Sequence, residues 1–315
     1  MTWGTDRIIR NGLIACMLLT AGFSQELYAQ GNVSQWVKAY IGGKGKDQKA
    51  FSSLMQHNPS ADVVKEVAAY VKDTNNTTFE YAVFLVKKIE KRVTDKQART
   101  SLVRSLLDCA LKQDAQLSKS ALRAMTIFEK TCFTDGIKED IRLIAAHYPS
   151  GRQEAMLLLG YVGESGDISY LNGLGRYTSL SKQDKYYRQL ALARLNDGDA
   201  VQELCAQIKE KKLNDEVVMN IVPDLIYTRN KKIFDLLVQE ILNDTPNCLS
   251  ANNDSQQLIL CAYRIMEQLS GKIVGFPVQT DRSGEIAGDY AAALEQARKW
   301  IVSTKLEYSI NTNYY

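Results

Sequence analysis

Signals for the start of a helix recur along the middle of this chain at a nearly constant spacing. Asp or Asn follows a short polar turn and precedes an apolar-periodic segment at Asp135, Asp167, Asp199 and Asn230. The intervals between them are 32, 32 and 31 residues. A side-chain oxygen at such a position accepts hydrogen bonds from the free N–H groups of the first helical turn, so these four residues are predicted N-caps. A constant interval of this length predicts a repeated structural unit.

A second series of helix starts lies between the first four. These starts lie near Ser118, Ser150, Ser181 and Asn214. Each period then contains a helix, a tight turn, a second helix and a connection. Only 5 residues of 315 are proline, and segments with the alternation of a β-strand are hard to find. The sequence therefore predicts an all-α fold, an α-solenoid of stacked antiparallel helix pairs.

Two segments carry a resemblance to a known repeat family. They are "LLLGYVGESGDISYL" and "LALARLNDGDAVQEL", each with a small and apolar first helix, a Gly-Asp turn and an apolar stripe on the second helix. This pattern resembles the HEAT-like repeats named after phycobilisome lyases, most clearly over 150–210 and more weakly over 115–245. Pro223 fits as well, because the first helix of such a repeat is often kinked. The tetratricopeptide repeat is the rival, since its period of about 34 residues is close.

The resemblance implies a groove lined by the second helix of each pair. Because tyrosine rings pack and form hydrogen bonds at once, tyrosines on this face favour a binding role. The residues expected in the groove are Tyr170, Asn172, Arg176, Tyr177, Gln202, Gln207, Lys231 and Asp235.

The chain divides into five predicted segments. They are a signal peptide (1–29), degenerate helical repeats (30–114), HEAT-like repeats (115–245), a helical cap with irregular loops (246–305) and a tail (306–315). Within the cap, helices are expected over 254–270 and from about Asp289 to Thr304.

The first thirty residues have the layout of a secretory signal. Arg7 and Arg10 precede an apolar stretch over 13–23, and Ala29 offers a small residue for cleavage. A lipobox ending at Cys16 is the alternative. The expected location is the periplasm or envelope of a Gram-negative bacterium. The apolar stretch is too short for a membrane span, and no later segment is apolar for long enough, so no transmembrane helix is expected in the mature chain.

Five cysteines follow the predicted signal peptide, without CxxC or metal-site spacing. Cys109 and Cys132 fall on helices too far apart along the chain to be bridged. Cys205 lies on an apolar stripe and is expected to be a small buried hydrophobe. Cys248, in a loop, and Cys261, thirteen residues later, form the one disulfide considered.

Tests for catalytic and cofactor motifs are negative. His57 and His147 lack zinc-site partners, and "GGKGK" lacks the spacing of a phosphate loop. We expect no catalytic residue, metal or cofactor. The net charge of +3, without a basic block, does not favour nucleic acid.

The sequence favours an exported, non-enzymatic scaffold that binds another envelope protein. The alternative is an envelope protein that binds a glycan or small ligand, and possibly hydrolyses it, with loops 244–253 and 271–286 around the site. These alternatives differ in one structural feature: a defined cavity near the loops favours the second. The oligomeric state is left open.

Overall fold

The computed structural model describes residues 34–56, 61–73, 75–112, 115–250 and 258–315. The predicted signal peptide, Cys16 and His57 lie outside these ranges. The fold is all-α, with neighbouring helices packed side by side, as the sequence predicts. The described residues form two compact units, one up to Lys112 and one from residue 115 onward. Each unit is described by itself below.

The first unit is a set of amphipathic helices. A helix over residues 34–42 precedes α2 (Gln48–Gln56), α3 (Ala61–Val71), α4 (Asn76–Ile89), the short 3₁₀ turn η1 (Glu90–Arg92) and α5 (Lys96–Ala110). Helix α3 packs against both α4 and α5. Leu102 and Leu106 of α5 are fully buried, and their spacing of four places them on one face. Asp95 begins α5 by accepting a hydrogen bond from Ala98 N at 2.7 Å.

The second unit contains the repeats and the C-terminal segment. Its elements are α6 (Ala115–Met125), η2 (Lys130–Cys132), α7 (Asp135–His147), α8 (Arg152–Val162), α9 (Ser165–Gly173), η3 (Leu174–Arg176), α10 (Lys182–Arg194), α11 (Gly198–Lys209), α12 (Asp215–Asn220), α13 (Val222–Tyr227), α14 (Lys231–Glu240), β1 (Pro246–Leu249), β2 (Leu258–Leu260), α15 (Cys261–Leu269) and α16 (Tyr290–Thr304).

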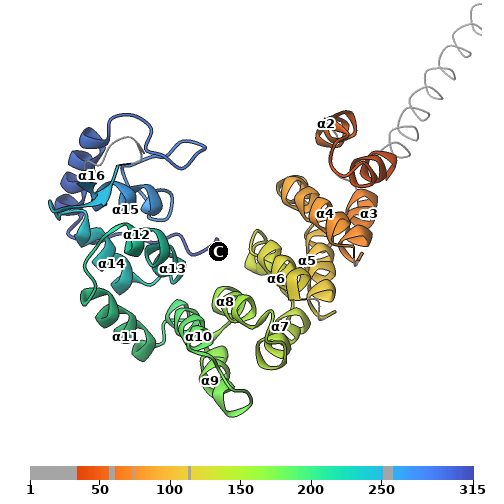
Figure 1. The fold of residues 1–315 in the computed structure, drawn as a ribbon, viewed down its shortest axis with the longest axis horizontal. Coiled ribbons are helices and arrows are strands. Elements are labelled where there is room, and N and C mark those ends of the chain that lie inside the picture. The colour runs from red at the N-terminus through yellow and green to blue at the C-terminus, as the bar shows by residue number, and fades with distance from the viewer. Residues whose placement is uncertain (1–33, 57–60, 74, 113–114, 251–257) are drawn as a thin grey trace, which may run out of the picture. The chain divides into compact units, whose positions relative to one another are not determined.

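The repeat helices of this unit lie in two layers. Helices α8, α10 and α13 form one layer and α7, α9 and α11 the other (Figure 1). Helix α8 packs against both α7 and α10, which explains why it is apolar around most of its circumference. The segments that are apolar on several faces are therefore helices that pack between neighbouring helices.

Polar side chains tie successive repeats together. The buried carboxylate of Asp167, at the start of α9, lies 2.7 Å from Arg142 Nε on α7. Arg152, 5% exposed, donates to the oxygens of Ala145 and Ala146 at the end of α7. Because burial of an unpaired guanidinium is costly, these contacts fix the register of one repeat on the next.

Of the four predicted N-caps, one is correct and three are displaced. Asn230 caps α14 as expected, accepting from Lys232 N at 3.0 Å. The caps of α7 and α11 are Thr134 and Asp197 instead of Asp135 and Asp199. In α9, Glu164 is the cap and Asp167 is the third helical residue.

The three corrections have a common physical reason. Each of these helices begins one to three residues earlier than the spacing suggests, where an extended residue lets a side chain reach the first turn. Asp167 still stabilises the N-terminus of α9, because its carboxylate accepts from the backbone N–H of Glu164 at 2.9 Å in a capping box.

Three further expectations concern the helices after residue 213. The helix predicted over 254–270 is wrong at residues 258–260, which form β2 and pair antiparallel with β1. Cys261–Leu269 is helical, as predicted, and residues 254–257 lie outside the described ranges. The helix expected from Asp289 is observed as α16, with Asp289 as its cap. The helix that contains Pro223 is interrupted at Ile221, between α12 and α13.

Replacement of the two aspartates that begin α11 separates the predicted cap from the observed one. Asp197→Ala is expected to lower the free energy of unfolding by about 1 kcal/mol, because the Ala200 N–H loses its acceptor at 2.9 Å. Asp199 is exposed and contributes mainly through the helix dipole, so Asp199→Ala is expected to cost less than about 0.5 kcal/mol at physiological salt. Urea denaturation measures both; equal losses would contradict the observed cap.

Candidate functional site

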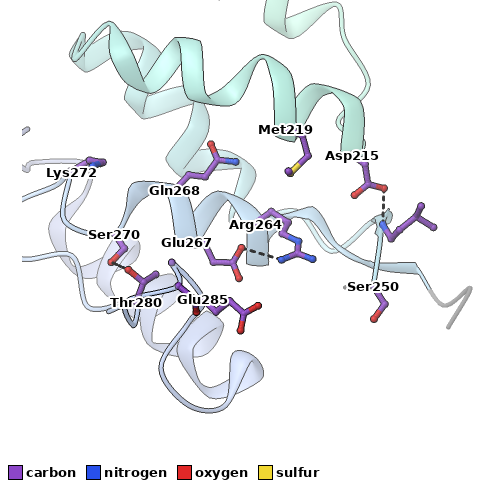
Figure 2. Close-up of a pocket in the computed structure, with 13 residues that line it drawn as sticks. Asp215, Met219, Ser250, Arg264, Glu267, Gln268, Ser270, Lys272, Thr280 and Glu285 are labelled. Carbon is purple, nitrogen blue, oxygen red and sulfur yellow. Dashed lines mark hydrogen bonds and ion pairs between the residues drawn. The ribbon is translucent and has the colours of Figure 1, made fainter. Parts of the chain in front are cut away.

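A polar pocket of about 820 Å³ lies where the end of the repeats meets the C-terminal loops. Four segments surround it: α12, the strand β1, α15 and the loop before α16 (Figure 2). Its lining residues are Asp215, Met219, Leu249, Ser250, Arg264, Glu267, Gln268, Ser270, Lys272, Thr280, Ser283, Gly284 and Glu285.

Helix α15 supplies the polar floor of this pocket. Arg264, Glu267 and Gln268 are spaced by three and four residues and so share one helix face. The opposite face is buried, with Cys261, Ala262, Ile265, Met266 and Leu269 in the core. The amphipathic pattern of α15 therefore directs its polar side chains toward the pocket.

Glu267 is held by two partners. Arg264 Nη1 lies 3.3 Å from Glu267 Oε2, and the Tyr290 hydroxyl donates to Glu267 Oε1 at 2.5 Å. Burial and the hydrogen bond to Glu267 raise the pKa of Tyr290. The phenol therefore stays protonated and remains a donor to the carboxylate.

The hairpin wall of the pocket is cross-linked. Cys248 on β1 and Cys261 at the start of α15 form a disulfide, with Cα atoms 5.1 Å apart. Both cysteines pack against Val218 of α12 in a small core cluster. Asp215 accepts from the Leu249 N–H at 2.7 Å. The wall is thus fastened to α12 and to α15.

Gln268 has one free acceptor. Its Nε2 donates to the Val218 oxygen at 2.9 Å, while its Oε1 is buried and accepts no hydrogen bond from the described residues. An unsatisfied buried oxygen is costly.

The loop before α16 supplies hydroxyls and further charges. Ser270 donates to the Val278 oxygen at 3.1 Å, and Asp281 organises the turn by accepting from Ser283 N at 2.8 Å. Burial, with a contribution from Arg229, lowers the pKa of Lys272. In the view of Figure 2, Asp215 and Ser250 lie at one end of the pocket and Ser270, Thr280 and Lys272 at the other.

The charges of the lining nearly balance. Three carboxylates (Asp215, Glu267 and Glu285) face two cations (Arg264 and Lys272). Groups of both signs thus line one pocket, without a strong field of one sign. Within the part of the chain that the structure describes, no group of His, Cys, Asp and Glu side chains could hold a metal ion.

The residues predicted from the second helices are distributed over several places. The Tyr170 hydroxyl donates to the Arg142 oxygen at 2.5 Å, and burial, followed by Glu139, raises its pKa to about 12. Asn172 and Arg176 are exposed, and Tyr177 is 72% exposed.

The other four predicted residues lie apart from these. Gln202 lines a cavity of about 300 Å³, and Gln207 lines a different one. Lys231 forms an ion pair with Asp235, and both contact the tail: Lys231 donates to the Leu306 oxygen at 2.6 Å and Tyr308 to Asp235 at 2.8 Å.

The loops 244–253 and 271–286, which the alternative prediction places around a site, supply seven of the thirteen lining residues. The lining residues of α12 and α15 are not among the predicted ones. The available signal was the polar face of α15. The other missed feature is the tail, which is ordered against the repeats and is described below.

No helix in the described ranges is both long and apolar enough to cross a membrane. No family model, no characterised protein and no solved structure matches this chain.

Proposed function

We propose that this chain is an exported, non-enzymatic binding protein and that the pocket beside the disulfide hairpin binds a neutral polyhydroxylated ligand, a glycan. The observation that carries the proposal is the convergence of donors and acceptors with nearly balanced charge in one cavity. Each sugar hydroxyl both donates and accepts, as such a lining requires.

The size and edges of the pocket support the same ligand class. Its volume of about 820 Å³ falls in the usual range for ligand pockets. Met219 and Leu249 are 63% and 54% exposed at its margin, where they offer apolar contact to the C–H face of a sugar ring. A strongly charged ligand would meet like charges in this lining, whichever its sign.

Export is part of the proposal. The charged, apolar and small-residue order of residues 1–29 supports a signal peptide, and the Cys248–Cys261 disulfide supports an oxidising compartment. We propose the periplasm or envelope of a Gram-negative bacterium.

A protein partner is the second candidate. The observation that favours it is the exposed Tyr177 ring beside the exposed Arg176, because tyrosine and arginine are enriched where proteins bind one another. In this case the HEAT-like surface, and not the pocket, would be the binding site.

A panel of neutral and acidic oligosaccharides tests the proposal. The chain is expected to bind neutral members, seen as a raised melting temperature and measured by calorimetry. Glu267→Gln is expected to weaken binding about fivefold, because a hydrogen bond to a charged acceptor contributes about 1 kcal/mol more than one to a neutral acceptor.

The matched control is Glu139→Gln. Glu139 also pairs with an arginine three residues away, Arg142 at 2.8 Å, but on α7. It should leave glycan affinity unchanged. Equal affinity of Glu267→Gln and the unmodified chain, or binding of acidic members alone, would reject the pocket as a site for neutral glycans.

A further inference from the structure

The tail of the chain lies as an extended segment against the repeat helices. Tyr161 of α8 donates to the Asn313 oxygen at 3.1 Å, and Arg194 of α10 donates to the Tyr314 oxygen at 2.8 Å. Arg229, after α13, donates to the Tyr315 oxygen at 3.1 Å. Figure 1 accordingly shows the end of the chain beside the layer formed by α8, α10 and α13.

An aromatic cage receives the ring of Tyr315. Its centroid lies 5.6 Å from that of Tyr161 and 5.2 Å from that of Tyr227. The Arg194 guanidinium lies 4.7 Å from the Tyr227 centroid and 5.6 Å from the Tyr315 centroid. One cation thus lies among aromatic rings, where its attraction to each ring adds to packing.

The two arginines of this cage lack acidic partners. Arg194 and Arg229 are each 8% exposed, and neither forms an ion pair with a carboxylate side chain in the described ranges. Nε and Nη1 of Arg229 are buried and donate to no acceptor among the residues that the structure describes. Burial, with a contribution from Arg194, lowers the pKa of Arg229 to about 10.

A negatively charged group is the chemical group that fits this arrangement. Two neighbouring buried guanidinium groups without a carboxylate side chain as partner carry a large desolvation cost. A carboxylate between them would supply the missing acceptors and could accept two hydrogen bonds from one guanidinium. The cage beside them accepts an aromatic ring, as Tyr315 demonstrates.

Apart from the Tyr315 ring, the last residues of the tail bury little side-chain surface. Its residues 312, 313 and 314 are exposed, and Tyr314 is 63% exposed. The hydrogen bonds at 313–315 use main-chain oxygens, which any extended peptide offers. A segment with so little buried surface opens at low free-energy cost.

We propose that Tyr161, Arg194, Tyr227 and Arg229 form a binding site for an extended peptide that carries an aromatic side chain next to a carboxylate, and that the chain's own tail occupies this site until such a peptide displaces it. This site is separate from the glycan pocket, and either proposal can fail without the other.

Binding of a synthetic peptide with the sequence of residues 309–315 tests the proposal. A shortened chain that ends at Tyr308 is expected to bind the free-acid peptide at least tenfold more tightly than the intact chain does, because its site is empty. The shortened chain keeps Tyr308, which packs against Trp300 at 5.5 Å. Fluorescence anisotropy of the labelled peptide measures the affinity, and circular dichroism checks folding.

Two altered peptides test the chemistry. The amidated peptide, and the peptide with Tyr315→Ala, are each expected to bind the shortened chain at least tenfold more weakly. In the Arg229→Gln variant of the shortened chain, the preference for acid over amide is expected to disappear, which a purely structural role of Arg229 would not produce.

Three results would overturn the proposal. They are equal affinity of shortened and intact chains, absence of binding to a folded shortened chain, and equal binding of acid and amide. If the shortened chain does not fold, the intact chain with Tyr315→Ala decides: it must bind the acid peptide more tightly than the unmodified chain, and equal binding rejects the proposal.

Discussion

Gly160→Ala is expected to lower the free energy of unfolding by about 3 kcal/mol, the upper part of the range for overpacked cores. A Cβ atom at this position would lie 2.3 Å from Tyr227 Oη and 2.8 Å from the Cα of Ala191. Gly160 is on α8 and Ala191 on α10, so the two helices approach through small residues. Because one obstacle is backbone, a change of rotamer cannot relieve the clash.

The Tyr227 side chain is equally constrained. Its hydroxyl donates to the Leu157 oxygen at 2.6 Å, and the residue is 9% exposed. Gly166→Ala in α9 is the control, since nothing lies within 4 Å of its added Cβ; it is expected to be neutral or stabilising by about 0.5 kcal/mol. Thermal and urea unfolding measure both. Equal stability of Gly160→Ala and the unmodified chain would contradict the packing of α8 on α10.

Removal of the disulfide is expected to have the second large effect. The double variant Cys248→Ala, Cys261→Ala should lose about 3 kcal/mol, the entropic value for a closed loop of about 15 residues. The two cysteines are 13 residues apart, and the bond fastens the hairpin to α15. Because this hairpin forms a wall of the pocket, glycan affinity should fall as well.

A reductant supplies the matched control for this prediction. Dithiothreitol should destabilise the unmodified chain to the level of the double variant and leave the double variant unchanged. Cys132→Ala, which removes a buried thiol outside the disulfide, should not alter the response to dithiothreitol. A melting temperature of the unmodified chain that is insensitive to full reduction would contradict the stabilising role of the bond.

The fold class could be predicted because two independent patterns agree. Regularly spaced helix starts indicate a repeated unit, and helices that are apolar on several faces must pack against neighbours on several sides. Both features require stacked helices. The exact starts could not be predicted, since Thr134 and Asp135, or Asp197 and Asp199, are all able to cap and only the local backbone decides between them. The short strand β2 precedes a helix with the same apolar character, so periodicity does not separate them.

The binding residues were harder to predict than the fold. The pocket joins Asp215 to Glu285 across seventy positions of sequence, a contact that depends on the tertiary arrangement. The tail is held through its main-chain oxygens, which accept from Arg194 and Arg229. Because every residue has such an oxygen, these contacts leave no pattern in the sequence. The groove expected from the second helices stays a prediction, with Lys231 and Asp235 in contact with the tail.

The most direct test of the pocket is methyl NMR of the methionine-labelled chain. Met219 lines the pocket and is 63% exposed, whereas Met156 is fully buried in α8; Met219→Leu assigns the first signal. Addition of the neutral oligosaccharide that most raises the melting temperature should shift the Met219 methyl resonance in a saturable way and leave Met156 unchanged. Saturable binding of that oligosaccharide with an unmoved Met219 signal would contradict the account.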